Sequence, residues 1–68
     1  MLSFIEKFQN DKHFYNVRTT DNESVGVIET GTGGCWWFYP HFPYSVNIKY
    51  EYLAEIYQKI TELKNAKV

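Results

Sequence analysis

The sequence has one cysteine, Cys35, among 68 residues. A lone thiol cannot form an intrachain disulfide, and it does not provide the paired cysteines of a zinc site. Basic charge is also scarce, since seven lysines and arginines face eight acidic residues and give a formal net charge of −1. This balance argues against a strongly basic nucleic-acid binder and against an acidic mimic of DNA.

Long apolar runs are missing as well. No stretch approaches the ~20 apolar residues that a membrane-spanning helix needs. Charges at Glu6 and Lys7 come too early for the apolar core of a secretory signal. With a single reduced cysteine, these features predict a cytoplasmic protein that does not enter a membrane.

Residues 1–68 have the length of one small domain, close to the lower limit for folding unaided. Stability is therefore expected to be marginal, and a partner or a second copy could add to it. Aromatic residues make up 19% of the chain, more than so small a core needs. Such rings dominate the energetics of both cores and interfaces.

Three short segments rich in β-formers predict an antiparallel meander: residues 13–19, 24–30 and 35–39. The polar residues 20–23 form the first turn, and the glycine-rich residues 31–34 form the second. The same glycines do not indicate a phosphate loop, because the lysine and the following helix of such a loop are missing.

A C-terminal helix is predicted by apolar residues that recur at spacings of three and four: Leu53, Ile56, Ile60 and Leu63. Polar residues should lie on the opposite side of this helix: Glu51, Glu55, Gln58 and Glu62. Glu55 and Lys59 have the spacing of a helical ion pair. The apolar stripe needs one face of the sheet as its partner, so the expected fold class is α+β.

Two other segments leave alternatives open. Ser3 followed by Glu6 has the form of a capping box, which favours a short helix over residues 2–10. The alternative is a strand, in which these residues alternate imperfectly. Residues 45–48 are either a short fourth edge strand or the approach to the C-terminal helix, with Asn47 as a candidate N-cap.

The third predicted strand carries four consecutive rings, from Trp36 to Tyr39. Neighbouring side chains in a strand point to opposite faces, so two rings must lie on each side of the sheet. The sequence does not decide which pair faces the helix. Gly26 in the preceding strand either leaves room for a bulky neighbour or marks a bulge.

A lone helix covers one face of such a sheet, and residues 2–8 are the segment available to fold over the other. If they do not, the uncovered rings form an exposed apolar patch, which is typical of partner sites. The candidate binding residues are the rings of the strand, of the loop after it and of the helix flank: Trp36, Trp37, Phe38, Tyr39, His41, Phe42, Tyr44, Tyr50 and Tyr57. A protein partner is favoured, and a homodimer is the alternative.

Other chemistries have weaker support. His13 and His41 could act as bases or metal ligands. Asp11 and Glu29 could supply a carboxylate partner, but no spacing requires it, and two histidines without a cluster give weak support for a metal site. Cys35 in a strand is more often a small buried side chain than a nucleophile. We expect no catalytic residue, no metal and no cofactor. Stacking of single-stranded bases on the rings is possible, but the basic residues it needs are few, so nucleic acid is the less favoured partner.

The order of features resembles a loose group of small accessory proteins encoded by tailed bacteriophages. The resembling residues are Phe14-Tyr15-x-Val17, Val25-Gly26-x-Ile28-Glu29, Trp36-Trp37-Phe38-Tyr39-Pro40 and Leu53-x-Glu55-Ile56-x-x-Lys59-Ile60-x-x-Leu63. The resemblance implies an accessory protein made in the cytoplasm of an infected bacterium, which binds a host or viral protein. It supplies no catalytic residues.

Overall fold

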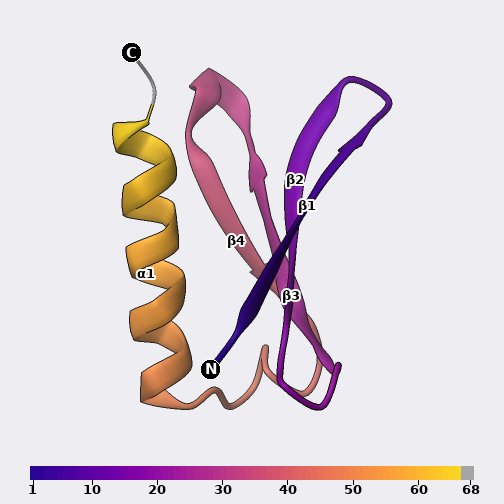
Figure 1. The fold of residues 1–68 in the computed structure, drawn as a ribbon, viewed down its shortest axis with the longest axis vertical. Helices are drawn as coiled ribbons and strands as arrows, with labels where there is room; N and C mark the ends of the chain where they lie inside the picture. The colour runs from indigo at the N-terminus through magenta and orange to yellow at the C-terminus, as the bar shows by residue number, and fades with distance from the viewer. Residues whose placement is uncertain (67–68) are drawn as a thin grey trace.

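The computed structural model describes residues 1–66. Four antiparallel strands form one sheet in the order β1-β2-β3-β4, and one long helix accompanies it (Figure 1). The elements are β1 (Ser3–Gln9), β2 (Lys12–Arg18), β3 (Ser24–Thr30), a 3₁₀ turn (Thr32–Gly34), β4 (Trp36–Pro40) and α1 (Tyr50–Asn65). The predicted α+β class and the three predicted meander strands are confirmed.

The predicted helix over residues 2–10 is wrong, because this segment is strand β1. It pairs with β2 along its whole length, from Gln9 opposite Lys12 to Ser3 opposite Arg18. The two strands are joined by Asn10 and Asp11, both with positive φ, at 52° and 64°. Two successive positive φ values define the type I′ turn, whose twist suits a tight hairpin.

A fourth strand therefore exists, but at the N-terminal end of the sheet. Residues 45–48 form no strand, and turns occupy residues 42–46. Asn47 does not cap the helix, because the N-cap position belongs to Lys49, which makes no side-chain capping bond. The Phe42–Pro43 peptide bond in this connection is cis.

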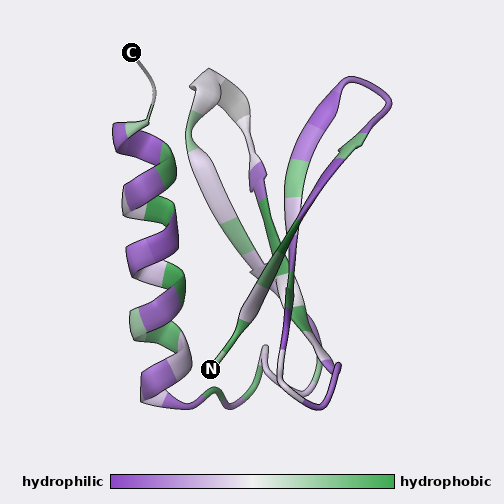
Figure 2. Ribbon diagram, viewed as in Figure 1, coloured by the Kyte–Doolittle hydropathy of each residue, from purple (hydrophilic) through white to green (hydrophobic). Residues whose placement is uncertain are grey.

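The register defines two faces of the sheet. Tyr15, Ile28 and Phe38 lie opposite one another on β2, β3 and β4, and α1 packs on this side, the inner face. Figure 2 shows that hydrophobic residues of α1 lie on its side turned to the sheet. The buried apolar residues are Leu2, Tyr15, Val17, Val25, Ile28 and Ile56.

Both predicted roles of Gly26 are confirmed. Val17 pairs with Gly26 while Arg18 pairs with Ser24, so Val25 is one extra residue in β3, and this bulge residue is fully buried. A Cβ atom on Gly26 would lie 2.8 Å from Cε1 of Phe38 and would also meet the backbone of Tyr39. The absent side chain lets the Phe38 ring cross over β3.

The helix stripe is confirmed at Ile56, Ile60 and Leu63, which pack on the core, but not at Leu53, which is 46% exposed. Tyr52 is half-buried against the core instead. Within residues 1–66, no helix is long and apolar enough to cross a bilayer.

The prediction that Glu55 lies on the polar side of the helix, away from the sheet, is wrong. Glu55 is half-buried, and its side chain is turned to β1. Its Oε1 accepts a hydrogen bond from the backbone N–H of Leu2 at 2.9 Å. The expected ion pair with Lys59 does not form among the described residues. The Lys59 ammonium lies 4.8 Å from the centroid of the Tyr15 ring instead.

Candidate functional site

The four rings of β4 divide between the two faces of the sheet, as the alternation of a strand requires. Trp36 and Phe38 face the helix, where both are half-buried against the core. Trp37 and Tyr39 face the other way, the outer face, and are 50% and 46% exposed. The sequence predicted this division but left its sense open.

Nothing in residues 1–66 covers the outer face, because the N-terminal segment extends the sheet as β1 and α1 packs on the inner face. Two rows of paired residues make up the centre of the outer face: Lys7–Phe14–Glu29–Trp37 and Ile5–Asn16–Val27–Tyr39. Five of these eight side chains are apolar or aromatic. They form a patch open to solvent rather than a second core.

The indole of Trp37 is held in place by the backbone of Gly31. A Cβ atom on Gly31 would collide with Cδ1 and Nε1 of this ring, so the ring lies directly against the Gly31 backbone. This contact limits the rotamers of Trp37 while one half of its surface stays exposed. A ring ordered before binding loses less conformational entropy when a partner covers it.

The loop after β4 is anchored to the first residue of β3 and to the residue before it. His41 Nδ1 lies 2.9 Å from Ser24 Oγ, and the Tyr44 hydroxyl donates to Glu23 Oε1 at 2.8 Å. The hydrogen bond to Glu23 raises the pKa of Tyr44 above its ordinary value of 10.0. Phe42 between them is 81% exposed.

The two helix tyrosines lie apart from the outer face. Tyr50 and Tyr57 are 80% and 75% exposed and belong to α1, which packs on the opposite side of the sheet. The nine predicted binding residues therefore divide among four regions: the outer face, the inner face, the loop after β4 and the exposed side of α1. The structure brings together Trp37 and Tyr39 on the outer face, and it adds Ile5, Phe14 and Val27, which were not among the predicted residues.

The inner face has a cluster that the sequence did not indicate. The Phe8 and His13 rings are stacked at 4.2 Å between centroids, and His13 Nε2 lies 2.7 Å from Glu6 Oε2. Trp36 meets the His13 ring edge-on at 5.5 Å. The sequence signal for this cluster is the alternation of Phe4, Glu6 and Phe8. In a strand, these three side chains lie on one face.

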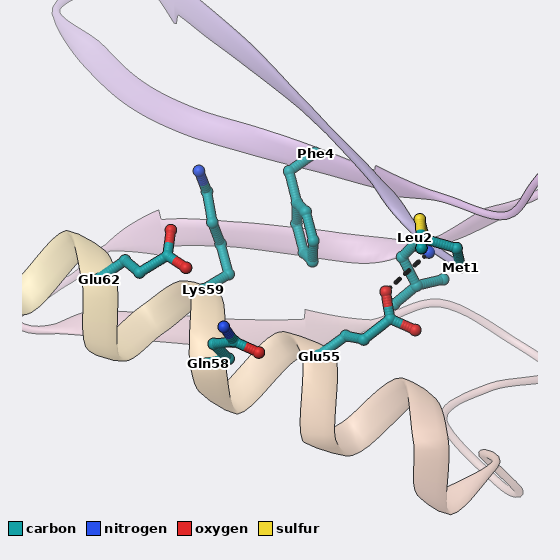
Figure 3. Close-up of a pocket in the computed structure, with 7 residues that line it drawn as sticks. All are labelled: Met1, Leu2, Phe4, Glu55, Gln58, Lys59 and Glu62. Atoms are coloured by element: carbon teal, nitrogen blue, oxygen red, sulfur yellow. Dashed lines mark hydrogen bonds between the residues drawn. The ribbon is translucent and has the colours of Figure 1, made fainter.

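Two of the hollows that flank the helix are also lined by residues of β1 or β2. One, of about 450 Å³, is lined by His13, Tyr15, Trp36 and Leu63 among others. The other, of about 410 Å³, lies between the start of β1 and α1, where Figure 3 shows Glu55 turned to Leu2 and the Lys59 side chain beside Phe4. The contacts of this second hollow join β1 to the helix, so we assign it a structural role.

Among the described residues, the His13–Glu6 pair is the one histidine–carboxylate pair at these two hollows, and no serine or cysteine is among their lining residues. Ser24 and His41 are within hydrogen-bonding distance, but both are remote from these hollows, and no described carboxylate bonds to the second ring nitrogen of His41. The expectation of a small buried side chain within a strand is wrong for Cys35, which directly precedes β4 and is exposed. Within residues 1–66, no three histidine, cysteine or acidic side chains are grouped as metal ligands.

The outer face thus has two exposed rings, and one of them, Trp37, lies against the backbone of Gly31. No protein-family model matches this sequence, and no curated protein or solved structure matches it either.

Proposed function

We propose that the protein is a small binding module without catalytic activity, which takes its partner on the outer face of the sheet. The observation that carries this proposal is the pair of exposed rings, Trp37 and Tyr39, on a face that neither α1 nor β1 covers. Tryptophan and tyrosine are enriched among the residues that dominate binding energy.

The surrounding residues support a contact surface of useful size. Ile5 is 39% exposed, and Phe14 and Val27 are half-buried in the same two rows. An apolar patch of this kind, bordered by charged side chains, is typical of sites that bind other molecules. The loop with the exposed Phe42 follows β4 directly and could lengthen the surface.

The biological setting comes from the resemblance to phage accessory proteins. It makes the module an accessory factor in the cytoplasm of an infected bacterium. The small number of basic residues favoured a protein partner, host or viral, with self-association as the alternative. These partner classes are predictions of the sequence, and the outer face is their proposed site.

The test compares what matched variants retain from a bacterial lysate, with and without nuclease treatment. The wild type and Tyr50→Ala/Tyr57→Ala, which removes two exposed rings elsewhere, should retain the same molecules. Trp37→Ala/Tyr39→Ala should lose them while its thermal unfolding stays cooperative. If all three proteins retain the same molecules equally, the outer face is not the contact surface.

A further inference from the structure

The charges of the sheet are sorted between its faces. The first 48 residues contain three basic side chains, Lys7, Lys12 and Arg18. All three lie on the outer face, because they share the strand alternation of Phe14 on β2 and Ile5 on β1. The number of basic residues in the sequence does not by itself show that these three share one face of the sheet.

The acidic side chains of the same segment are placed elsewhere, with one exception. Glu6 is on the inner face beside His13, Asp11 is in the hairpin turn, and Asp21 and Glu23 are in the loop before β3. Glu29 alone lies on the outer face, between Phe14 and Trp37. The outer face is therefore net positive, although the whole chain has a net charge of −1.

We infer that the outer face binds single-stranded nucleic acid, an inference that depends on the proposed contact surface. Exposed rings together with positive charge are the two components of such sites: rings stack on unpaired bases, and lysine or arginine contacts the phosphates. Aromatic side chains on the open face of a four-stranded sheet are a recurrent platform for two or three bases.

The positions of the basic residues and of the exposed rings indicate how a bound nucleic-acid strand would lie across the sheet. The basic residues lie on β1 and β2. The two most exposed rings of the outer face, Trp37 and Tyr39, lie on β4, about 10–14 Å away at ~4.8 Å per strand. Phosphates would follow β1 and β2, and bases would turn toward β4. Two rings two residues apart on one strand offer platforms about 7 Å apart.

Asn16 lies on β2 with two of the basic residues, and Glu29 on β3 lies between these two zones. A carboxylate there disfavours a phosphate at the centre of the face, and it can accept hydrogen bonds from exocyclic amino groups of bases. A double helix keeps its bases stacked inside, out of reach of rings on the surface of a sheet. We therefore expect single strands to bind more tightly than duplex of the same sequence.

The experiment measures the fluorescence anisotropy of labelled 12-nucleotide single strands and of the matching duplex as the protein is added. Three phosphate contacts predict a slope of about −2 for log K against log salt, at ~0.7 per contact for single strands. A Trp36→Phe background leaves Trp37 as the sole indole, and its emission should be quenched on binding.

Matched variants separate a site on the outer face from general attraction to charge. Lys7→Gln/Lys12→Gln should weaken binding at least tenfold near 50 mM salt and reduce the slope by about 1.4. Lys49→Gln/Lys64→Gln removes the same charge from outside the sheet and should have little effect. Tyr39→Leu should weaken binding on the order of tenfold, and Tyr57→Leu should not.

The inference is wrong if the folded wild type binds no single strand at 20 mM salt, or if both lysine pairs weaken binding equally. If oligonucleotides fail but lysate proteins are retained in a manner that needs Trp37 and Tyr39, the proposed function stands with a protein partner. If no single strand binds and sedimentation shows a dimer that Trp37→Ala abolishes, the inference is wrong and the face mediates self-association. If neither oligonucleotide nor lysate binding needs the face, both proposals fail.

Discussion

Trp36 and Trp37 are consecutive residues of β4, yet their side chains lie on opposite faces of the sheet. The Trp36 ring packs among inner-face rings, with its centroid 5.5 Å from that of His13 and 5.8 Å from that of Tyr15. The Trp37 ring lies against Gly31 and is 50% exposed. Two identical side chains thus have different roles, and substitution can separate them.

Alanine at these two positions should have unequal effects on stability. Trp36→Ala removes packing from the inner face and should lower the unfolding free energy by about 2–3 kcal/mol. Trp37→Ala removes a half-exposed ring and should cost about 1 kcal/mol or less. Urea denaturation followed by circular dichroism measures both, and equal losses would contradict the assignment of faces.

Gly26→Ala should be strongly destabilising. The new methyl group would meet Phe38 Cε1 at 2.8 Å and the rigid backbone of Tyr39, so β3 and β4 must separate locally. Overpacking of this kind costs typically ~1–3 kcal/mol, and a backbone contact places it at the upper end. An unchanged urea midpoint would show that the strands separate at no cost.

Gly31→Ala should displace the indole of Trp37 with little loss of global stability. The added methyl group occupies the space of Cδ1 and Nε1, while Gly31 itself has an extended backbone that alanine adopts readily. In a Trp36→Phe background, the emission maximum of Trp37 reports the displacement. Identical emission spectra with and without the substitution would contradict the contact.

Glu55→Ala should lower the unfolding free energy by about 1 kcal/mol, because the N–H of Leu2 then loses its partner. Glu51→Ala is the matched control, since Glu51 is an exposed glutamate of the same helix. Urea denaturation of both variants tests the difference. If the two substitutions are equally mild, the bond does not tie β1 to α1.

Alkaline pH should weaken the fold through Tyr15. Burial, followed by the nearby Glu6 carboxylate, raises the pKa of Tyr15 above its ordinary value of 10.0. The phenol then ionises first in the unfolded chain, so its contribution to stability is complete below pH 10 and declines as pH rises above it. Lys59 also faces this ring.

Urea midpoints at pH 8.0 and 10.5 measure this decline. It should be smaller in Tyr15→Phe than in the wild type, and unchanged in Tyr57→Phe, which alters an exposed tyrosine. Equal declines in all three proteins would assign the pH dependence to other groups.

The meander and the helix could be predicted because their signals are local: β-branched and aromatic runs separated by turn residues, and apolar spacings of three and four. Strand β1 could not, because Ser3 and Glu6 match a capping box while the strand depends on pairing with β2. The Asn10-Asp11 turn was the available signal, since both residues tolerate positive φ.

The sequence predicted that the rings of β4 divide between the two faces of the sheet, but it did not predict which pair faces the helix. It depends on the bulge at Val25 and on the register of Trp37 opposite Glu29, which no single segment determines. The sorting of Lys7, Lys12 and Arg18 onto one face was hidden for the same reason. A residue of a strand acquires its face only when the neighbouring strand is known.

Pro40, the last residue of β4, has a consequence for sheet growth. The bonds from Gly31 N–H to Cys35 O and from His41 N–H to Val25 O fix the alternation of β4, so Trp36 and Phe38 direct their backbone groups away from β3. Pro40 is the next residue of β4 that faces away from β3, and it has no backbone N–H to donate. An incoming strand would find only two backbone N–H donors along this edge of β4, too few to extend the sheet by pairing with another chain.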